Sequence, residues 1–533
     1  MNCSATRLPY RQTHAFSRIA LDYIDQSPGL KPFFESAPTQ QGIRQAIEAR
    51  MKFPNNRPLL VEALEQQYAG VETGEKVRAN IQSLLSAQSF TVTTAHQNNI
   101  FTGPLYFIYK IVHTIRLADQ LNELYPGQHF VPVYYIGSED ADLEELNHTW
   151  VGKDRLTWET SQTGTVGRMK IDTALTALIG RMEGQLQVQP HGAEITRLLR
   201  EYYREGRSIA EATFLFVNHL FRDFGLVVLQ PDQPALKSTM TALFEDELLQ
   251  QQASGIVEQT TAKLEAAGYK VQAQPREINL FYLEGDRRDR ISVRNGKWTV
   301  LNGGPVFSRE EILQELKDHP ERFSPNVILR GLYQETILPN IAFIGGGGET
   351  AYWLQLKDLF KHYQVPFPVL VLRNSFLIIE KKYRELAVKL GLTAEDLFLS
   401  EQELLNKLVL RETENKTRLN GSREAADQLY ARLQEQAAAV DTTLAGHVQA
   451  LHKAAVYRLD ELEKKMLRAE RRKFSDQQRQ IQSLKAHLFP GGGLQERRDN
   501  LSYYYARWGD TFLRKLYEAS PTLEHEFVIL AEQ

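Results

Sequence analysis

The spacing of apolar residues predicts helices over about the first 85 residues and strands after residue 90. Apolar side chains recur at helical spacing over 16–24, and a second amphipathic run covers 77–85. Residues 90–95 (FTVTTA) are instead rich in β-forming residues, and a polar loop and the apolar-periodic run 105–124 follow them. Another short apolar run lies at 130–136. Strand, loop, helix and strand in this order predict a parallel βαβ unit.

Further short apolar runs extend this unit to a larger sheet. Several of them are followed by helical stretches, and they lie at 226–229, 327–329, 341–344 and 369–372. We therefore expect an α/β fold with a doubly wound, Rossmann-like core of parallel strands. Three other runs look antiparallel, at 278–283, 291–293 and 298–301, with Asn295-Gly296 in the place of a tight hairpin turn. We interpret this antiparallel stretch as an insertion in the core.

The segment 401–488 has a different composition, dominated by Leu, Ala, Glu, Lys, Gln and Arg and without proline. Its apolar residues recur at three, four or seven, as in a coiled coil, at Leu429, Leu433, Val440, Leu444, Val448, Leu451, Ala455, Leu459, Leu462 and Met466. Asn420-Gly421 offers one chain reversal, and 441–443 offers an N-cap for a second long helix. The turn residues 489–493 end the helical region, and the last 40 or so residues look like a helix that returns to the core.

These patterns give three regions. We place the core at 1–400, with insertions at about 150–225 and 235–325, an antiparallel coiled-coil arm at 401–488, and a returning segment at 489–533. One helical hairpin buries its apolar stripe only in part. A second copy of the arm could cover the rest of the stripe in an interface with two-fold symmetry. We therefore expect a homodimer. The alternative is an arm that folds back and buries its stripe on its own core.

Composition excludes several classes of protein. Hydrophobic residues make up 42% and charged residues 24% of the 533 residues, which is typical of globular chains. The formal charge of -3 and the absence of a basic stripe argue against a nucleic-acid partner. Cys3, in a segment expected to be mobile, is the only cysteine, so a disulfide framework is excluded and a reducing compartment is expected. No apolar stretch is long enough for a membrane span and no dense metal-ligand set is present, so we expect a cytoplasmic protein and predict no metal.

The loop after the first predicted core strand is the first candidate for binding chemistry. It contains His96, Gly103, Pro104 and Tyr106, between a strand and a helix N-terminus. Backbone N–H groups and the helix dipole at such a place bind phosphate, and Gly103 allows close approach of a ligand. His96 could donate to a phosphate or polarise a carbonyl. The alternative is an ordinary turn with a capping histidine.

The second candidate is the run Gly345, Gly346, Gly347 and Gly348 followed by Glu349, between a predicted strand and a helix. Four glycines in series carry an entropic cost, which close contact with a ligand would explain. The run matches neither GxGxxG nor a P-loop. Glu349 could bind a ribose hydroxyl or an amine, or it could only complement the helix dipole. The alternative for the run is a plain tight turn.

Charged residues at other strand ends complete the candidate site. Glu139, Asp140 and Asp142 follow the second core strand and could hold an ammonium group or Mg²⁺, although a solvated helix N-terminus has the same composition. Arg330 and Arg373 are placed for phosphate or carboxylate, with Asn374 and Ser375 next in the chain, although each arginine could equally form a structural ion pair. Because the carboxyl ends of parallel strands share one edge, we expect these residues to converge on one pocket.

Several blocks of the sequence together resemble one family, the bacillithiol biosynthesis cysteine-adding enzymes. The blocks run in order from about residue 90 to 500: FTGPLYFIYK, VPVYYIGSEDADLEELNH, FSPNVILRGLYQETILPNIAFIGGGGETAYWLQLK, VPFPVLVLRNS and LFPGGGLQERRDN. The resemblance implies a class I nucleotidyltransferase-like core with connective-peptide insertions and a coiled coil that dimerises. It places residues 103–106 at the first nucleotide signature and 345–349 at the turn that meets the ribose.

The resemblance also implies an activity, the joining of L-cysteine to glucosaminyl malate in the last step of bacillithiol biosynthesis. A carboxylate needs a leaving group before it acylates an amine, so adenylation or phosphorylation of the cysteine carboxylate is expected, with ATP as the activator. No metal site is predicted, although Mg²⁺ could accompany the nucleotide. On this reading His96, Tyr106, Glu139, Asp140, Asp142 and Arg373 are the catalytic candidates, and Gly103, Pro104, 345–349, Asn374 and Ser375 are the nucleotide-binding candidates. The alternative is a coiled-coil scaffold with a degenerate core. Aminoacylation of tRNA is disfavoured by the near-neutral charge.

Overall fold

The computed structural model describes residues 1–412 and 419–533, and the side chains of 470–472 are left out of the description. The chain divides into two compact units, one formed by Met1–Leu377 with Leu494–Leu530 and the other by Ile378–Gly493 with Ala531–Gln533. The boundaries expected from composition, 400 and 488, fall inside the second unit. Among the described residues, no helix is long and apolar enough to cross a membrane.

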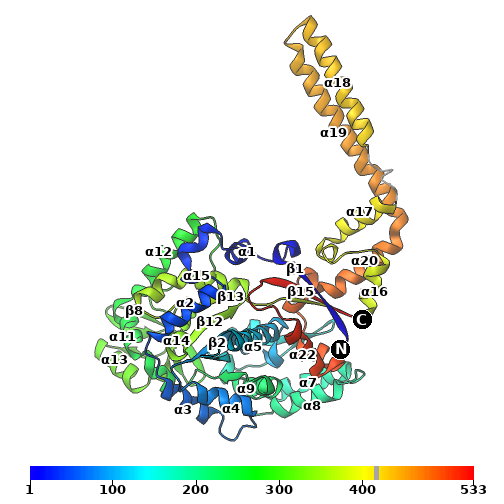
Figure 1. Ribbon diagram of the computed structural model, residues 1–533. Coiled ribbons are helices and arrows are strands. Elements are labelled where there is room, and N and C mark those ends of the chain that lie inside the picture. The colour runs from blue at the N-terminus through cyan, green and yellow to red at the C-terminus, as the bar shows by residue number, and fades with distance from the viewer. Residues whose placement is uncertain (413–418) are drawn as a thin grey trace. The chain divides into compact units, whose positions relative to one another are not determined.

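The core of the first unit is a five-stranded parallel sheet with the order β13-β12-β2-β3-β6 (Figure 1). Its strands are β2 (Ser89–Gln97), β3 (His129–Gly137), β6 (Val227–Leu229), β12 (Asn340–Gly345) and β13 (Val369–Leu372). Numbered by their order in the chain, they follow the pattern 3-2-1-4-5, so the predicted doubly wound core is confirmed. The order reverses between β2 and β12, and ligands bind at such a switch point.

Helices cover this sheet with apolar side chains. Residues of α2 (Gln40–Met51) and α5 (Tyr106–Leu124) pack with residues of β2, β3, β12 and β13 in one buried cluster. The other α-helices before residue 320 are α1 (Arg18–Ile24), α3 (Arg57–Gln67), α4 (Glu75–Ser83), α6 (Leu143–Leu146), α7 (Thr173–Leu186), α8 (Gly192–Tyr202), α9 (Ile209–Phe221), α10 (Pro234–Lys237), α11 (Thr241–Gln250), α12 (Gln252–Ala266) and α13 (Arg309–Asp318). The helix α15 (Gly347–His362) follows β12 and begins at the glycine run.

A second sheet forms the predicted antiparallel insertion. Its order is β10-β9-β8-β7-β11, from β7 (Leu280–Glu284), β8 (Arg287–Arg294), β9 (Lys297–Val300), β10 (Val306–Phe307) and β11 (Phe323–Pro325). Asn295 and Gly296 join β8 to β9 with φ angles of 51° and 71°, as a two-residue hairpin turn of the primed type requires. The insertion and its hairpin are therefore confirmed. A smaller hairpin joins β4 (His148–Val151) to β5 (Asp154–Thr157).

The strand predicted at 327–329 is wrong, because these residues begin the helix α14 (Val327–Ile337). The Asn326 side chain caps the helix by accepting a hydrogen bond from Ile328 N at 2.9 Å. Ile328, Leu329, Leu332, Tyr333 and Ile337 are buried at helical spacing. A run of three apolar residues fits the periodicity of a strand and that of a helix, so only the pattern over a longer segment distinguishes the two.

The chain termini form strands that the sequence reading missed. β1 (Cys3–Pro9) and β15 (Glu526–Glu532) lie in a three-stranded sheet of order β1-β15-β14, where β14 is Phe376–Ile379. The helical runs expected at 16–24 and 77–85 are confirmed as α1 and α4, but the expectation of helices over the first 85 residues is wrong at Cys3–Pro9, which forms a strand. The expected C-terminal helix consists of two helices, α21 (Leu501–Trp508) and α22 (Asp510–Ala519).

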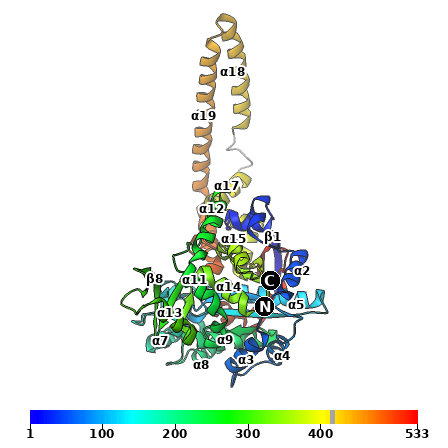
Figure 2. The ribbon, with the colours of Figure 1, turned by 90° about the vertical axis from the view of Figure 1, so that its left-hand side faces the viewer.

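The second unit contains the helical arm. It comprises α16 (Lys381–Lys389), α17 (Glu401–Glu412), α18 (Asn420–Val440), α19 (Leu444–Arg471) and α20 (Ser475–Leu488). The helices α18 and α19 lie side by side in both views (Figures 1 and 2), and the ion pairs Arg423–Asp460 and Asp427–His452 show that they are antiparallel. The predicted break at 441–443 is confirmed. Asn420-Gly421 begins α18 and does not itself reverse the chain, while the preceding residues 413–418 lie outside the described part.

Candidate active site

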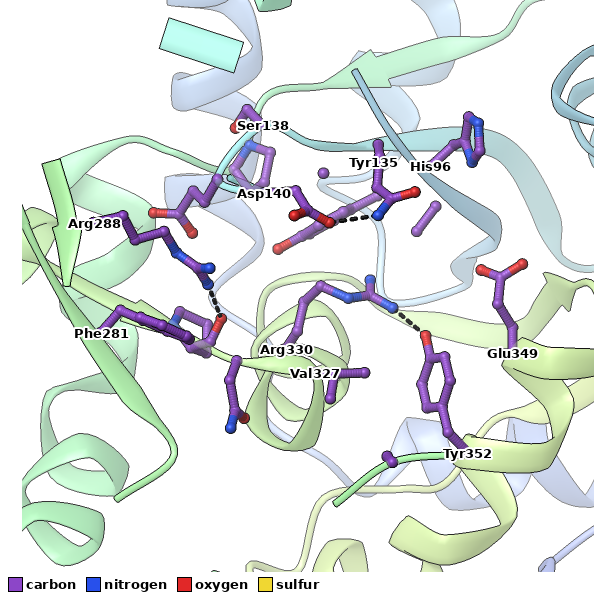
Figure 3. Close-up of a pocket in the computed structure, with 18 of the residues that line it drawn as sticks. His96, Tyr135, Ser138, Asp140, Phe281, Arg288, Val327, Arg330, Glu349 and Tyr352 are labelled. Carbon is purple, nitrogen blue, oxygen red and sulfur yellow. Dashed lines mark hydrogen bonds between the residues drawn. The ribbon is translucent and has the colours of Figure 1, made fainter. Parts of the chain in front are cut away.

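A cavity of about 710 Å³ lies at the carboxyl ends of β2 and β3 in the first unit (Figure 3). Its walls come from the ends of these strands, from the starts of α5, α14 and α15, and from the insertion. The cavity thus lies beside the switch point between β2 and β12, where open α/β sheets bind ligands. Five cationic and three acidic residues line it: Lys110, Arg276, Arg288, Arg290 and Arg330, and Glu139, Asp140 and Glu349.

The loop after β2 is held in a strained conformation. Phe101 and Thr102 have positive φ angles of 50° and 69°, which non-glycine residues rarely adopt. Gly103 has φ of 60°, and a Cβ on it would lie 2.6 Å from Asn99 Cβ. Asn500 Nδ2 fixes the loop by donating to Phe101 O at 2.8 Å and to Gly103 O at 2.7 Å. Gly103 and Pro104 therefore shape the loop but do not line the cavity.

The same loop buries polar atoms without a protein partner among the described residues. These atoms are His96 Nε2, Asn98 Oδ1 and Nδ2, Asn99 Oδ1 and Thr102 Oγ1. Buried polar groups are almost always hydrogen-bonded, so several unsatisfied atoms in one loop need an explanation. Strain and unsatisfied polar groups together are typical of ligand-binding segments.

His96 lies in the cavity wall as a neutral side chain. It is 8% exposed, stacks on Phe107 at 4.9 Å between ring centroids, and meets the edge of Tyr106 at 5.4 Å. Burial, reinforced by the positive charges of Lys110 and Arg373, lowers the pKa of His96 well below its usual value. Its imidazole can therefore donate or accept a hydrogen bond at neutral pH but carries no charge. Burial likewise raises the pKa of Tyr106 to about 12, so this phenol remains protonated.

Glu349 connects the glycine run to the cavity. Its Oε2 accepts a hydrogen bond from Gly346 N at 2.9 Å, and its carboxylate forms an ion pair with Lys110. Lys110 Nζ also donates to Ala95 O at 2.9 Å. Burial lowers the pKa of Lys110, and the charge of Glu349 opposes this shift. The pair places one cation and one anion at the starts of α5 and α15.

The glycine run has a packing role that sequence reasoning left open. A Cβ on Gly345 would lie 2.9 Å from the Phe343 ring, and one on Gly347 would lie 3.3 Å from Ala20 Cβ. Gly346 is the N-cap of α15, and Gly347 and Gly348 form its first turn. Among these residues, only Glu349 lines the cavity. The run therefore allows tight packing and gives the cavity a helix N-terminus.

Glu139 belongs to a chain of buried charges. Its carboxylate contacts Lys237 Nζ, which also lies 3.1 Å from Asp232 Oδ1, and Arg168 holds Asp232 through two hydrogen bonds of 2.8 and 2.9 Å. The Lys237 side chain is fully buried. Burial raises the pKa of Glu139, and the positive charge of Lys237 opposes this shift. The network fixes Glu139 in the cavity wall.

Asp140 and Asp142 are separated by the structure. Asp140 lines the cavity, where its Oδ2 accepts a hydrogen bond from Gln97 Nε2 at 2.5 Å (Figure 3). Asp142 is exposed and caps α6, since its Oδ1 accepts from Glu145 N at 3.2 Å. The solvated helix cap is therefore the correct interpretation for Asp142, and its placement among the catalytic candidates is corrected.

Arg330 points into the middle of the cavity, between Asp140 and Glu349 (Figure 3). Its guanidinium donates to Tyr352 Oη and lies 5.9 Å from the Tyr135 ring centroid. Arg330 Nη1 also donates to Gln334 Oε1 at 3.5 Å, and the remaining N–H groups of the guanidinium have no acceptor in the described part of the chain, so they can face a carboxylate or a phosphate.

Arg373, Asn374 and Ser375 lie beside the cavity without lining it. Arg373 is 6% exposed and forms an ion pair of 2.7 Å with the buried carboxylate of Glu496, while its Cζ lies 5.1 Å from the Tyr106 ring. Asn374 N donates to His113 Nδ1 at 3.1 Å, and Ser375 Oγ donates to Glu496 at 3.2 Å. All three have structural partners, so the ion-pair alternative describes Arg373.

Sequence reasoning did not select several residues of the cavity wall. Lys110, Tyr352, Arg288 and Arg290, which line the cavity, were not proposed for the site. Lys237, which holds Glu139 from behind the wall, was not proposed either. Among these residues, only Arg288 and Arg290 could have been found from the sequence pattern. Two basic residues at every second position of a strand lie on the same face of the sheet. The strand prediction there began only at residue 291.

Comparison with known proteins gives matches over the whole chain. Residues 1–374 match the family model "Bacillithiol biosynthesis BshC, N-terminal Rossmann-like domain", and 376–532 match "Bacillithiol biosynthesis BshC, C-terminal coiled-coil domain". A Flavobacterium psychrophilum protein named "Putative cysteine ligase BshC" is 39% identical over 98% of both chains. Namesakes from Flavobacterium johnsoniae and Christiangramia forsetii are 37% and 36% identical, each over 98% of this chain and 99% and 98% of their own.

Proposed function

This chain belongs to the bacillithiol biosynthesis BshC family, and on that premise we propose that it is a ligase that joins L-cysteine to the amine of glucosaminyl malate. The reaction forms an amide bond between the cysteine carboxyl carbon and the amino-sugar nitrogen. One carboxylate oxygen leaves, and the amine gives up its proton. We place this reaction in the cavity at the carboxyl ends of β2 and β3.

The observation that supports this proposal is the juxtaposition of acidic and cationic side chains in one cavity. Glu139 and Asp140 lie on the β3 side, and Arg330 and Lys110 lie toward the starts of α14, α5 and α15. A carboxylate can bind an ammonium group and take its proton, while arginine and lysine stabilise negative charge on an acyl or phosphoryl oxygen. Amide formation needs both, with the amine and the carboxyl carbon held between them.

The nucleotide that the family resemblance implies fits one end of the cavity. The start of α15, the Lys110 ammonium group and the unsatisfied Nε2 of His96 gather there. A helix N-terminus and a lysine bind phosphate, and a neutral imidazole can donate a hydrogen bond to it. When bound, ATP would supply the leaving group that a free carboxylate lacks. The carboxylate of Glu349 is the group in this corner that can accept from a ribose hydroxyl.

We assign the proton transfer to the acids of the β3 end. Asp140 is within reach of ligands in the cavity, and Gln97 fixes the orientation of its carboxylate. Glu139 is held by Lys237 and supplies a second negative charge beside it. Two carboxylates at this point favour binding of the amino sugar as an ammonium ion. One of them can accept the proton whose loss gives the nucleophilic amine, and the second proton leaves the nitrogen for solvent as the amide bond forms.

The test is ligation by purified protein. With L-cysteine, glucosaminyl malate and ATP, we expect a product that has the mass of the two substrates less one water, and no product when ATP is left out. A protein that forms no product and binds neither cysteine nor nucleotide in calorimetry would favour the alternative of a non-catalytic coiled-coil scaffold.

We also propose that the arm makes the protein a homodimer. Leu429, Leu433, Leu444, Leu451 and Leu462 in α18 and α19 are each 38% to 47% exposed although the two helices pack on each other. Each Å² of apolar surface that stays in contact with water forgoes about 25 cal/mol of the free energy that burial would contribute. A second arm would cover this stripe with the same residues, as a two-fold interface requires.

Replacing Leu451, Leu459 and Leu462 with glutamate should therefore give a folded monomer. The matched control is Gln449→Glu, which adds a charge at an exposed polar position of the same helix. Sedimentation velocity at micromolar concentration measures the effect. Wild-type protein that sediments as a monomer would contradict the proposal.

A further inference from the structure

Two arginines of the insertion face the cavity without a carboxylate partner among the described residues. Arg288 and Arg290 lie two positions apart on β8, so they share one face of the sheet, and both line the cavity. Arg287 and Asp289 lie on the opposite face and pair with each other at 2.8 Å. The unpaired positive charge of β8 is thus confined to the cavity face.

Arg288 is held in a fixed orientation. Its Cζ stacks 3.8 Å from the Phe281 ring centroid, its Nε donates to Ser324 Oγ at 3.0 Å, and Nη2 donates to Pro325 O at 3.2 Å. Figure 3 shows Arg288 beside Phe281, on the side of the cavity opposite Glu349. The contacts come from β7 and β11, so the guanidinium is positioned before any ligand arrives. A positioned guanidinium loses little entropy when it binds a carboxylate.

The acids on the β3 side act on Arg288 only through space. Burial lowers the pKa of Arg288, and the negative charges of Glu139 and Asp140 oppose this shift, but neither acid forms an ion pair with Arg288 or Arg290 in the described part of the chain. Glu139 contacts Lys237, and Asp140 accepts from Gln97. Arg290 is exposed and has Phe281 as its cross-strand neighbour. Other arginines of this unit, such as Arg50, Arg168 and Arg373, have a carboxylate partner. A pair of unpaired guanidinium groups on one wall is therefore a candidate receptor for carboxylates.

We infer that Arg288 and Arg290 form a dicarboxylate-binding wall that determines which acceptor substrate enters the cavity. The inference rests on the proposed function, in which the acceptor carries the two carboxylates of its malate group. With these carboxylates on β8, the amino sugar extends toward Asp140 and Glu139, and the cysteine carboxyl carbon lies toward Arg330. The insertion thus selects the acceptor substrate by binding its carboxylates, and residues of the core carry out the reaction.

The experiment compares two acceptors, glucosaminyl malate and methyl glucosaminide, which keeps the amine and lacks the carboxylates. In Arg288→Gln and in Arg290→Gln, kcat/KM for glucosaminyl malate should fall by about 10-fold to 100-fold, mainly through KM. The value for methyl glucosaminide should remain within about twofold. Arg287→Gln, on the opposite face of the same strand, is the matched control and should leave both values unchanged.

Equal losses with both acceptors, or no loss with either, would overturn the inference. Because Arg288 also contacts Ser324 and Pro325, unfolding in urea is measured for its variant, and the exposed Arg290 supplies the variant that leaves packing intact. Calorimetry with L-malate separates this inference from the proposed function. Malate binding that both variants lose, in a protein without ligase activity, would support the wall and refute the ligase. If the protein ligates glucosaminyl malate and neither variant slows the reaction, the ligase function is supported and the dicarboxylate-binding wall is refuted.

Discussion

Asp140→Asn should lower kcat/KM for ligation by at least about 100-fold, the size of effect typical of a lost general base. Asparagine has nearly the shape of aspartate, so it can keep the hydrogen bond from Gln97 to the side-chain oxygen. It cannot hold an ammonium ion through charge or accept a proton. The measurement is steady-state ligation, followed by the mass of the product.

The neighbouring Asp142→Asn is the control for this prediction. Asp142 is an exposed cap of α6, and asparagine caps helices as well as aspartate does. Its ligation rate should stay within about twofold of wild type. Equal losses in the two variants would contradict the assignment, because only Asp140 lines the cavity. An Asp140 variant with normal activity would also contradict it.

Arg373→Met should lower the free energy of unfolding by about 3–5 kcal/mol, because it leaves the buried Glu496 carboxylate without its cation. The activity of the folded protein should change far less, since Arg373 does not line the cavity. Urea unfolding gives the stability, and ligation at low temperature, where the variant is folded, gives the activity.

A double variant, Arg373→Met with Glu496→Gln, tests the cause of this loss. Removing both charges should restore most of the lost stability, because no unpaired charge stays buried. If Arg373→Met were stable but inactive, Arg373 would instead act on the substrate, as the position of the arginine after β13 first indicated.

The sequence pattern predicted the core well, because β3 and β12 are short apolar runs and β2 is rich in β-branched residues. It failed at 327–329, where three apolar residues fit a strand and a helix equally. It also missed β1, which has one buried residue in seven and therefore lacks the apolar signal of a core strand. Its partner strand lies more than 500 positions away in the chain.

In the candidate site, too, the sequence predicted the features that depend on neighbouring residues and missed those that depend on contacts between distant parts of the chain. Local pattern selected His96, Tyr106, Glu139, Asp140 and Glu349, because each follows a strand or begins a helix at the shared edge. It could not separate Asp140 from Asp142, since the difference depends on the direction of a side chain at the end of β3. The role of Arg373 depends on Glu496, a residue 123 positions away, and spacing within one segment carries no information about such a contact.

The most direct measurement of the central claim is a crystal structure with L-cysteine and glucosaminyl malate bound. We predict that the sugar amine lies about 3 Å from a carboxylate oxygen of Asp140 or Glu139, a hydrogen-bonding distance. The malate carboxylates should contact Arg288 and Arg290. Substrates bound elsewhere on the protein, with this cavity filled only by water, would contradict the claim that it is the active site.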